Sequence, residues 1–120
     1  MTTLVSFVSH SMADRAELAV HGEIDASNTA ALHDAISDVV RGGRTCVVDL
    51  SQTSYLDSAG INTLFRVHRH LDQLGIRLHL VAPVGSCARY ALNLVCAHRI
   101  IPIHDAADAA RAALEVPSAT

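Results

Sequence analysis

Apolar and polar positions alternate at the beginning of the chain. Residues 4–9 alternate weakly, and a second run of strand-forming residues extends over residues 16–24. Polar residues around Asp14 separate the two runs, as they do in the turn of a β-hairpin. The pattern therefore predicts two neighbouring strands at the start of the domain.

Later segments show the spacing of helices with one apolar face, in which apolar residues recur at i, i+3, i+4 and i+7. Gly42-Gly43 and Gly75 are expected to end the first two of these helices, and Asp105 is expected to cap the last. The predicted helices cover residues 32–40, 61–74, 88–95 and 106–115.

Short β-branched runs lie between the predicted helices. Residues 45–50 show no alternation, which is typical of a parallel strand covered on both faces. Residues 77–82 form the next strand, and residues 100–103 are predicted as an edge strand because Pro102 cannot donate to a sheet. Residues 51–57 are predicted as a polar loop. The order ββαβαβαβα predicts an α/β fold with a mostly parallel sheet of about five strands and about four helices.

The composition fits one domain with an aliphatic core. Half of the 120 residues are apolar, Trp is absent, and Phe and Tyr occur twice each. We expect a single domain over residues 1–120, with a core at about residues 4–115 and a flexible tail at residues 116–120.

Charge and hydropathy narrow the class of function. The net charge is −3, and the nine basic residues are scattered arginines, so there is no basic stripe for a nucleic-acid backbone. No run approaches the ~18 apolar residues of a membrane-spanning helix, and no signal peptide is recognisable. Three cysteines without close spacing do not indicate a disulfide scaffold. We therefore expect a cytoplasmic protein without direct nucleic-acid or membrane partners.

The most informative stretch, residues 49–61, runs from the end of the predicted central strand into a helix. Such strand ends carry function in open α/β sheets. Ser58 falls at or next to the helix N-cap, where its hydroxyl should be exposed and where the helix dipole favours negative charge. On spacing alone, the simpler interpretation is that Asp57 and Ser58 cap a helix and that Gly60 allows close packing.

Residues 49–61, Asp-Leu-Ser-Gln-Thr-Ser-Tyr-Leu-Asp-Ser-Ala-Gly-Ile, closely resemble the signature of bacterial anti-sigma factor antagonists of the STAS superfamily. In that signature a strand ending in Asp-Leu-Ser is followed by an apolar residue and Asp-Ser-Ser/Thr/Ala-Gly-Leu. Residues 21–25, His-Gly-Glu-Ile-Asp, resemble the family's Gly-Glu-Leu-Asp segment before the first helix. The order of strands and helices agrees over about residues 14–114.

The resemblance implies a protein-binding switch. Ser58 would be phosphorylated by an anti-sigma factor that is a serine kinase; the kinase, not this chain, would bind ATP and Mg²⁺, so no cofactor is expected here. The unphosphorylated form would bind the kinase and free a sigma factor, and a phosphatase would reset the phosphoprotein. Besides Ser58, the partner-binding residues implied are Asp25, Ser27, Asn28, Asp57, Ala59, Gly60 and Asn62.

Three residues of this stretch depart from the common pattern. Ala59 stands where a second hydroxyl is frequent, Ile61 replaces Leu, and Asn62 stands where Gly is frequent. Ser58 is therefore the only hydroxyl at the helix start, and Asn62 is a candidate for tuning the fit to a particular kinase.

Other chemistries find less support. A receiver domain of a response regulator needs a Lys, which this chain lacks, and no Gly-x-Ser-x-Gly elbow indicates a hydrolase. We expect neither an enzyme nor a metal site, because the spacing of His and Cys does not match a closed zinc site. We interpret four of the histidines as surface or strand-face residues: His21, His33, His79 and His104.

The cysteines support an alternative function. Cys87 and Cys96 flank the short third helix, and their oxidation would alter its packing. The protein would then be a STAS interaction or scaffold module controlled by redox state or a ligand instead of phosphorylation. The simpler interpretation is that Cys46 lies in the core and that the other two are small packing residues.

Overall fold

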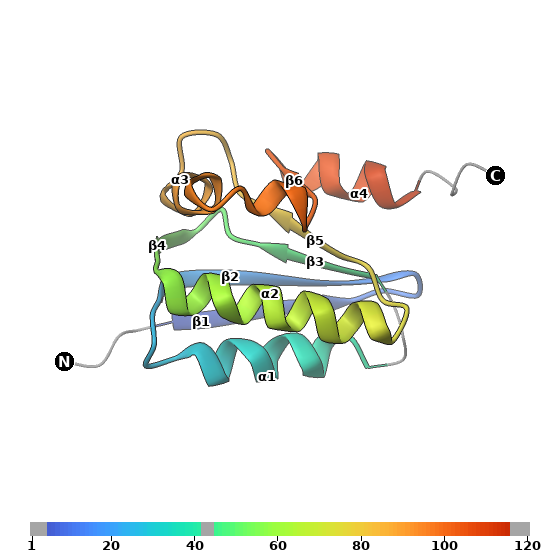
Figure 1. The fold of residues 1–120 in the computed structure, drawn as a ribbon. Helices are drawn as coiled ribbons and strands as arrows, with labels where there is room; N and C mark the ends of the chain where they lie inside the picture. Colours follow the sequence, from blue (N-terminus) through green and yellow to red (C-terminus); the bar gives the residue numbers. More distant parts are fainter. Residues whose placement is uncertain (1–4, 42–44, 116–120) are drawn as a thin grey trace.

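Strands β1 (Val5–Ser11) and β2 (Arg15–Ile24) form the predicted hairpin (Figure 1). The computed structural model describes residues 5–41 and 45–115. The expectations for Leu4, for Gly42-Gly43 and for the tail at residues 116–120 lie outside the described residues.

The described residues form one six-stranded sheet, in the order β1-β2-β3-β5-β6, with β4 also paired to β2. Among the described strands only the hairpin is antiparallel, which confirms the mostly parallel α/β fold. The remaining elements are α1 (Thr29–Val39), β3 (Thr45–Asp49), β4 (Thr53–Leu56), α2 (Ser58–Gln73), β5 (Leu78–Val81), α3 (Cys87–Leu94), the 3₁₀ helix η1 (Ala97–Arg99), β6 (Ile103–His104) and α4 (Ala107–Glu115).

Strand β4 lies inside the segment predicted as a polar loop, so that prediction was wrong. The ten-residue β2 is longer than β3, which pairs only with its first half. Strand β4 pairs with the second half, and the buried Thr53 hydroxyl donates to the Val20 carbonyl at 2.9 Å. The second half of β2, which β3 leaves unpaired on that side, therefore pairs with residues 53–56, although this polar segment has no clear strand pattern of its own.

Two predictions near the C-terminus also need correction. The edge strand begins at Ile103 instead of Ile100, because the residues before it turn into η1. Pro102 fits at its start, since its carbonyl accepts from Leu80 N at 2.9 Å and no donor is needed. Asp105 was predicted to cap the last helix, but α4 begins two residues later, at Ala107. The Asp105 carboxylate instead accepts from Arg89 Nη1 at 2.7 Å.

Helices cover both faces of the sheet, which explains the aliphatic composition. Helices α1 and α2 lie on one side in Figure 1 and α4 lies on the other, while α3 packs against β4. The larger core lies between the sheet and α1 and α2, and its fully buried side chains include Leu18, Leu32, Ile36, Leu64 and Leu80. A smaller cluster joins Val47 and Val81 to Ala110 of α4.

An ion pair fixes α4 to the sheet. Glu17 of β2 is 8% exposed and accepts from Arg111 Nη2 at 2.7 Å and from Arg111 Nε at 2.8 Å. Arg15 Nε donates to the same carboxylate at 2.9 Å. The hydrogen bonds from Arg111 contribute most to lowering the pKa of Glu17 to about 2, and burial opposes that change.

On the same face, the two histidines predicted on strand faces meet. The rings of His79 and His104 stack with centroids 5.1 Å apart, and His79 Nδ1 lies 2.8 Å from His104 Nε2. Burial lowers the pKa of His79 to about 4, with smaller contributions from the charges of His104 and Arg77. The neutral form of His79 is therefore the one that the fold stabilises.

We predict that Glu17→Gln lowers the free energy of unfolding by about 3 kcal/mol at pH 7, because it leaves Arg111 without its buried partner. In the wild type this stabilisation is complete above the ordinary carboxyl pKa of 4.5 and is lost as the pH falls towards 2. Urea unfolding followed by circular dichroism between pH 2.5 and 7 measures both effects. Asp108→Asn is the matched control, since Asp108 pairs with the same Arg111 at a site that is 95% exposed.

Gly60 sets how closely α2 approaches the sheet. A Cβ atom at this position would lie 2.7 Å from Ile24 Cγ2 and 2.7 Å from Leu56 Cδ1, closer than two carbon atoms can pack. The absence of a side chain at Gly60 therefore lets the first turn of α2 contact the ends of β2 and β4.

We predict that Gly60→Ala lowers the free energy of unfolding by about 1 to 3 kcal/mol, because α2 must move away from Ile24 and Leu56. In a helix with open space at this position, Gly→Ala would instead raise the free energy of unfolding by up to about 1 kcal/mol. The sign of the change therefore shows whether α2 packs closely at Gly60. Chemical unfolding of Gly60→Ala and of the exposed control Asn62→Ala measures the change in the free energy of unfolding. A gain in stability for Gly60→Ala would contradict the close approach.

Candidate functional site

The predicted site lies where β2 and β4 end and α1 and α2 begin, on the left of Figure 1. Ile24 and Leu56 are partners in the sheet, and Asp57 N donates to the Ile24 carbonyl at 3.3 Å. Both motifs found in the sequence, residues 21–25 and 49–61, therefore converge on one end of the sheet.

Asp57 is the N-cap of α2. Its side chain accepts from Gly60 N at 3.0 Å, and its carbonyl accepts from Ile61 N at 3.0 Å. Ser58 follows as the first residue of the helix. Its side chain is exposed, and within the described part of the chain its hydroxyl has no hydrogen-bond partner. The Ser58 hydroxyl is thus open to a reagent, in the positive field of a helix N-terminus.

The turn before α1 lies beside this hydroxyl-bearing helix end. Asp25 Oδ1 accepts from Ser27 N at 2.8 Å, and Asn28 Oδ1 accepts from Asp25 N at 3.0 Å. Asn28 Nδ2 also donates to the Glu23 carbonyl at 2.8 Å. Asn28 occupies the N-cap of α1 but uses its side chain to close this turn instead of capping the helix. The predicted residues Asp25, Ser27 and Asn28 form one ordered turn.

A shallow hollow extends from this end along the groove between α1 and α2. It has a volume of about 330 Å³ and is lined by Thr29, Ala30, His33, Asp34, Thr63 and Arg66. Asn62 is exposed on α2 and Ala59 is half-buried. The exposed parts of the predicted set therefore belong to a continuous surface made by the first turns of two helices.

Sequence reasoning missed an apolar surface on the other side of this site. Helix α3, which packs against β4, exposes Tyr90 to 69% and Leu94 to 67%, and Val84 just before it is 74% exposed. Tyr55 of β4 is 47% exposed. The apolar pattern that predicts this helix comprises Ala88, Ala91, Leu92 and Val95. Of these, Ala88 and Leu92 are buried but Val95 is 49% exposed, and Tyr90 and Leu94 lie outside the pattern.

The cysteines do not form a close pair. Cys46 is buried as predicted, whereas Cys87 and Cys96 are exposed free thiols, so the prediction that these two are packing residues was wrong. Cys87 begins α3 and Cys96 lies beyond its end. The seven helical steps from Cys87 to Leu94 alone advance about 10 Å along the helix axis, which exceeds the Cα separation of a disulfide. A disulfide within one chain therefore requires α3 to unwind.

The described residues offer neither a cluster of metal-ligating side chains nor a membrane-spanning helix. No group of three or more His, Cys, Asp or Glu side chains in this part of the chain could hold a metal ion. Likewise, none of the helices between residues 5 and 115 is both long and apolar enough to cross a membrane.

Known proteins resemble this chain over most of its length. The family model described as the STAS domain matches residues 13–110. The anti-sigma-F factor antagonist RsfB of Mycobacterium tuberculosis is 36% identical over 81 residues, which make up 67% of this chain and 65% of RsfB. The match thus spans slightly less than two thirds of that relative.

Solved structures show the same architecture. An anti-sigma factor antagonist from Mycobacterium paratuberculosis has a TM-score of 0.85 at 25% identity, covering 94% of this chain and 96% of that one. The anti-sigma factor antagonist SpoIIAA in its unphosphorylated form has a TM-score of 0.72 at 17% identity, covering 92% and 98%. SpoIIAA from Bacillus in its phosphorylated form has a TM-score of 0.66 at 17% identity, covering 92% and 100%. Because the family model covers most of the sequence and its expected strand and helix order is present, this chain belongs to the STAS domain family.

Proposed function

We propose that this protein is an anti-sigma factor antagonist, a non-catalytic regulator that binds an anti-sigma factor through the surface around Ser58. The observation that carries the proposal is the exposed hydroxyl of Ser58 at the first position of α2, beside the ordered turn at Asp25. Two relatives, RsfB and the protein from Mycobacterium paratuberculosis, are named as such antagonists. Their identities of 36% and 25% support the same role here.

The switch that we propose is phosphorylation of Ser58 by the anti-sigma factor. The Ser58 Oγ would attack the γ-phosphorus of ATP; a new P–O bond forms, the bond to the bridging oxygen breaks, and ADP leaves. The kinase would hold ATP and Mg²⁺ and accept the hydroxyl proton. Ser58 suits this role because its oxygen is exposed and has no partner to give up in the described structure.

Phosphorylation would leave the fold intact and act on the interface. A phosphoryl group brings a charge of about −1.5 to −2, which the N-terminus of α2 tolerates. The Asp57 cap does not involve the Ser58 side chain, so the helix start survives. SpoIIAA in its phosphorylated and unphosphorylated forms has the fold of this chain, which supports a switch without refolding.

Partner release would follow from charge. In the complex the phosphate would lie close to the carboxylates of Asp57 and Asp25, and docking would remove water from all three. Burying a charge without a matching partner costs several kcal/mol. The phosphoprotein would therefore leave the kinase until a phosphatase hydrolyses the phosphoester. This role would be carried out in the cytoplasm, where sigma factors act on transcription.

The docking surface that we propose has a polar half and an apolar half. The polar half comprises Asp25 and Ser27, in a turn that the buried Asn28 holds together, and the exposed residues of the first turns of α2, including Asn62. The apolar half is the exposed side of α3, with Tyr90 and Leu94, which adjoins β4 and hence the approach to Ser58. An apolar exposed helix face next to a polar rim is typical of protein interfaces.

We predict that one anti-sigma kinase from the same genome binds the wild type and Ser58→Ala within about threefold of each other. With Mg-ATP it should add one phosphate to the wild type only, seen by intact mass. Ser58→Glu should bind at least about tenfold more weakly, because a buried unpaired charge at the interface costs more than 1.4 kcal/mol. Gln73→Glu, which adds the same charge at an exposed position in the last turn of α2, is the control for charge alone.

If the phosphate maps to another residue, or if Ser58→Glu binds like the wild type, the switch is wrong while the antagonist role stands. If no such kinase binds the wild type, the protein is a STAS interaction module of another kind, and redox control through Cys87 and Cys96 is the next function to test.

We also predict that Tyr90→Ser and Leu94→Ser each weaken kinase binding at least about tenfold, as expected when a large apolar contact is truncated at an interface. Isothermal titration against the same kinase measures this. Both side chains are mostly exposed, so folding should be unaffected, and thermal unfolding verifies it. Leu74→Ser, which removes a 60% exposed side chain just beyond the far end of α2, is the matched control and should bind normally. Equal binding by all variants would exclude α3 from the interface.

A further inference from the structure

The outer edge of β1 has no covering element in the described part of the chain. Strand β1 pairs with β2 over all seven of its residues and with no other described strand. Half of the N–H and C=O groups of an edge strand point away from its sheet and can pair with another strand. Among the described residues, the outer edge of β1 from Ser6 to His10 is therefore a row of main-chain donors and acceptors that no other strand pairs.

Strand β1 also lacks the devices that keep edges from pairing. Native edges are commonly protected by charged side chains, by Pro, by a bulge or by shortness. Residues 1–13 contain no Asp, Glu, Lys or Arg, and β1 contains no Pro. The β1–β2 register is continuous from Val5 to Ser11. The other edge strands are protected. Strand β6 has only two residues, and β4 is covered by α3.

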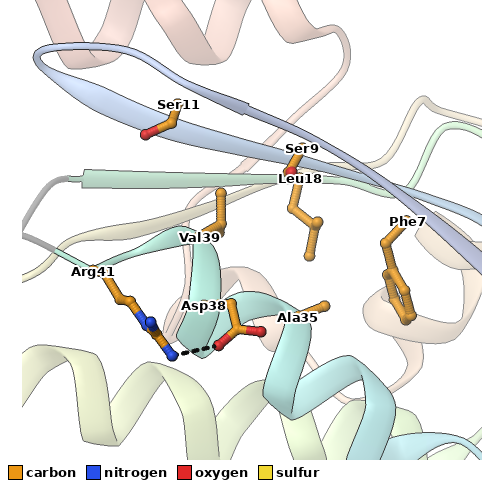
Figure 2. A pocket seen from close by; sticks show the side chains of 8 residues that line it. All are labelled: Phe7, Ser9, Ser11, Leu18, Ala35, Asp38, Val39 and Arg41. Atoms are coloured by element: carbon orange, nitrogen blue, oxygen red, sulfur yellow. Dashed lines mark hydrogen bonds and ion pairs between the residues drawn. The ribbon is translucent and has the colours of Figure 1, made fainter.

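A hollow of about 380 Å³ lies under this edge, between β1 and the second half of α1. Figure 2 shows that Phe7, Ser9 and Ser11 of β1 border it on one side. Ala35, Asp38 and Val39 of α1, with Arg41 just beyond the helix, border it on the other. Asp38 and Arg41 contact each other at 3.2 Å. The hollow is open beside the edge strand, so a strand added there could place a side chain over it.

We propose that β1 is a homodimerisation edge, on which β1 of a second copy pairs in antiparallel register about Val8. In this arrangement Val8 meets Val8 of the second copy, Phe7 meets Ser9, and Ser6 meets His10. The two-fold axis makes each contact occur twice. The result is one sheet that runs through both copies.

The properties of the strand favour a second copy as the occupant. Val8 is 46% exposed on the face opposite to Phe7, and pairing about Val8 buries this side chain against its equivalent. Phe7 of each copy comes beside Ser9 of the other and over the apolar part of its hollow. No pair in the register sets like charges opposite each other, because the strand contains no Asp, Glu, Lys or Arg and its one histidine, His10, lies opposite Ser6. The edge is therefore complementary to itself.

The size of the seam limits its strength. A standard interface involves about 20 to 30 residues a side, and this seam, centred on Ser6–His10, involves far fewer. We therefore expect a weak dimer, with a dissociation constant of about 10 µM to 1 mM. The hollow beside the seam is lined by the second half of α1, whereas Ser58 is the first residue of α2, at the end of the sheet where α1 begins. We therefore expect dimerisation to leave the kinase-binding surface open.

The first test is sedimentation equilibrium of the purified chain from 1 µM to 2 mM under reducing conditions. The wild type should pass from monomer to dimer, and Val8→Lys should raise the dissociation constant at least about tenfold, because two Lys side chains would then face each other. Val84→Lys is the matched control, as Val84 is 74% exposed and lies on the loop before α3. A wild type that stays monomeric, or a Val8→Lys variant that dimerises normally, overturns the proposal.

Disulfide trapping tests the register without a change of charge. In a background of Cys87→Ser and Cys96→Ser, Val8→Cys should form a covalent dimer on mild oxidation, since paired Cβ atoms lie about 4.5–5.5 Å apart. Ser6→Cys should not, because Ser6 faces His10 of the second copy. Equal trapping of both variants, or trapping of Ser6→Cys alone, would exclude pairing about Val8. Thermal unfolding of each variant confirms that the monomer is folded, and the small Val8→Cys change keeps the test valid if Val8→Lys destabilises the chain.

Discussion

The pairing of β4 with the second half of β2 is the interaction on which the functional end of this molecule depends. It brings residues from two distant parts of the sequence to one place, because Ile24 and Leu56 become neighbours in the sheet. The hydrogen bond from Thr53 Oγ1 to the Val20 carbonyl satisfies a buried hydroxyl at the start of this pairing, and the bond from Asp57 N to the Ile24 carbonyl continues it beyond the strand. Without this short strand, Ser58 and the turn at Asp25 would have no fixed relation.

The end of the sheet in turn determines the environment of Ser58. Asp57 leaves β4 in an extended conformation and caps α2, so the next residue lies on the first turn of the helix with its hydroxyl outward. Gly60 permits α2 to start against Ile24 and Leu56, which keeps the helix start close to the turn before α1. One local sequence, Leu-Asp-Ser-Ala-Gly, therefore ends a strand, begins a helix and exposes a nucleophile. Because these five residues have three structural roles, a short motif accounts for much of the family resemblance.

The sequence predicted the hairpin, the helices and the central strand because each has a strong local pattern. The short β4 could not be predicted in this way, since its existence depends on the unpaired half of β2 and not on its own residues. The same holds for the contacts between Glu17 and Arg111 and between His79 and His104, whose partners are far apart in sequence. For the candidate site, the motifs at residues 21–25 and 49–61 pointed to Ser58 and the turn at Asp25, but neither predicted the exposure of Tyr90 and Leu94. Whether an apolar helix residue faces solvent depends on how the helix packs.

The interactions that stabilise the fold and the residue of the proposed switch lie in different parts of the molecule. The aliphatic core between the sheet and α1 and α2 and the buried ion pair at Glu17 do not involve the Ser58 side chain. A charge added to Ser58 therefore changes the electrostatics of an exposed surface without entering the core. A helix N-terminus is well suited to this arrangement, because its dipole offsets the added charge within the domain but not the cost of burying that charge against a partner. Under the proposed function, phosphorylation of Ser58 would therefore change the free energy of binding and not that of folding, which is the property that a reversible protein-binding switch requires.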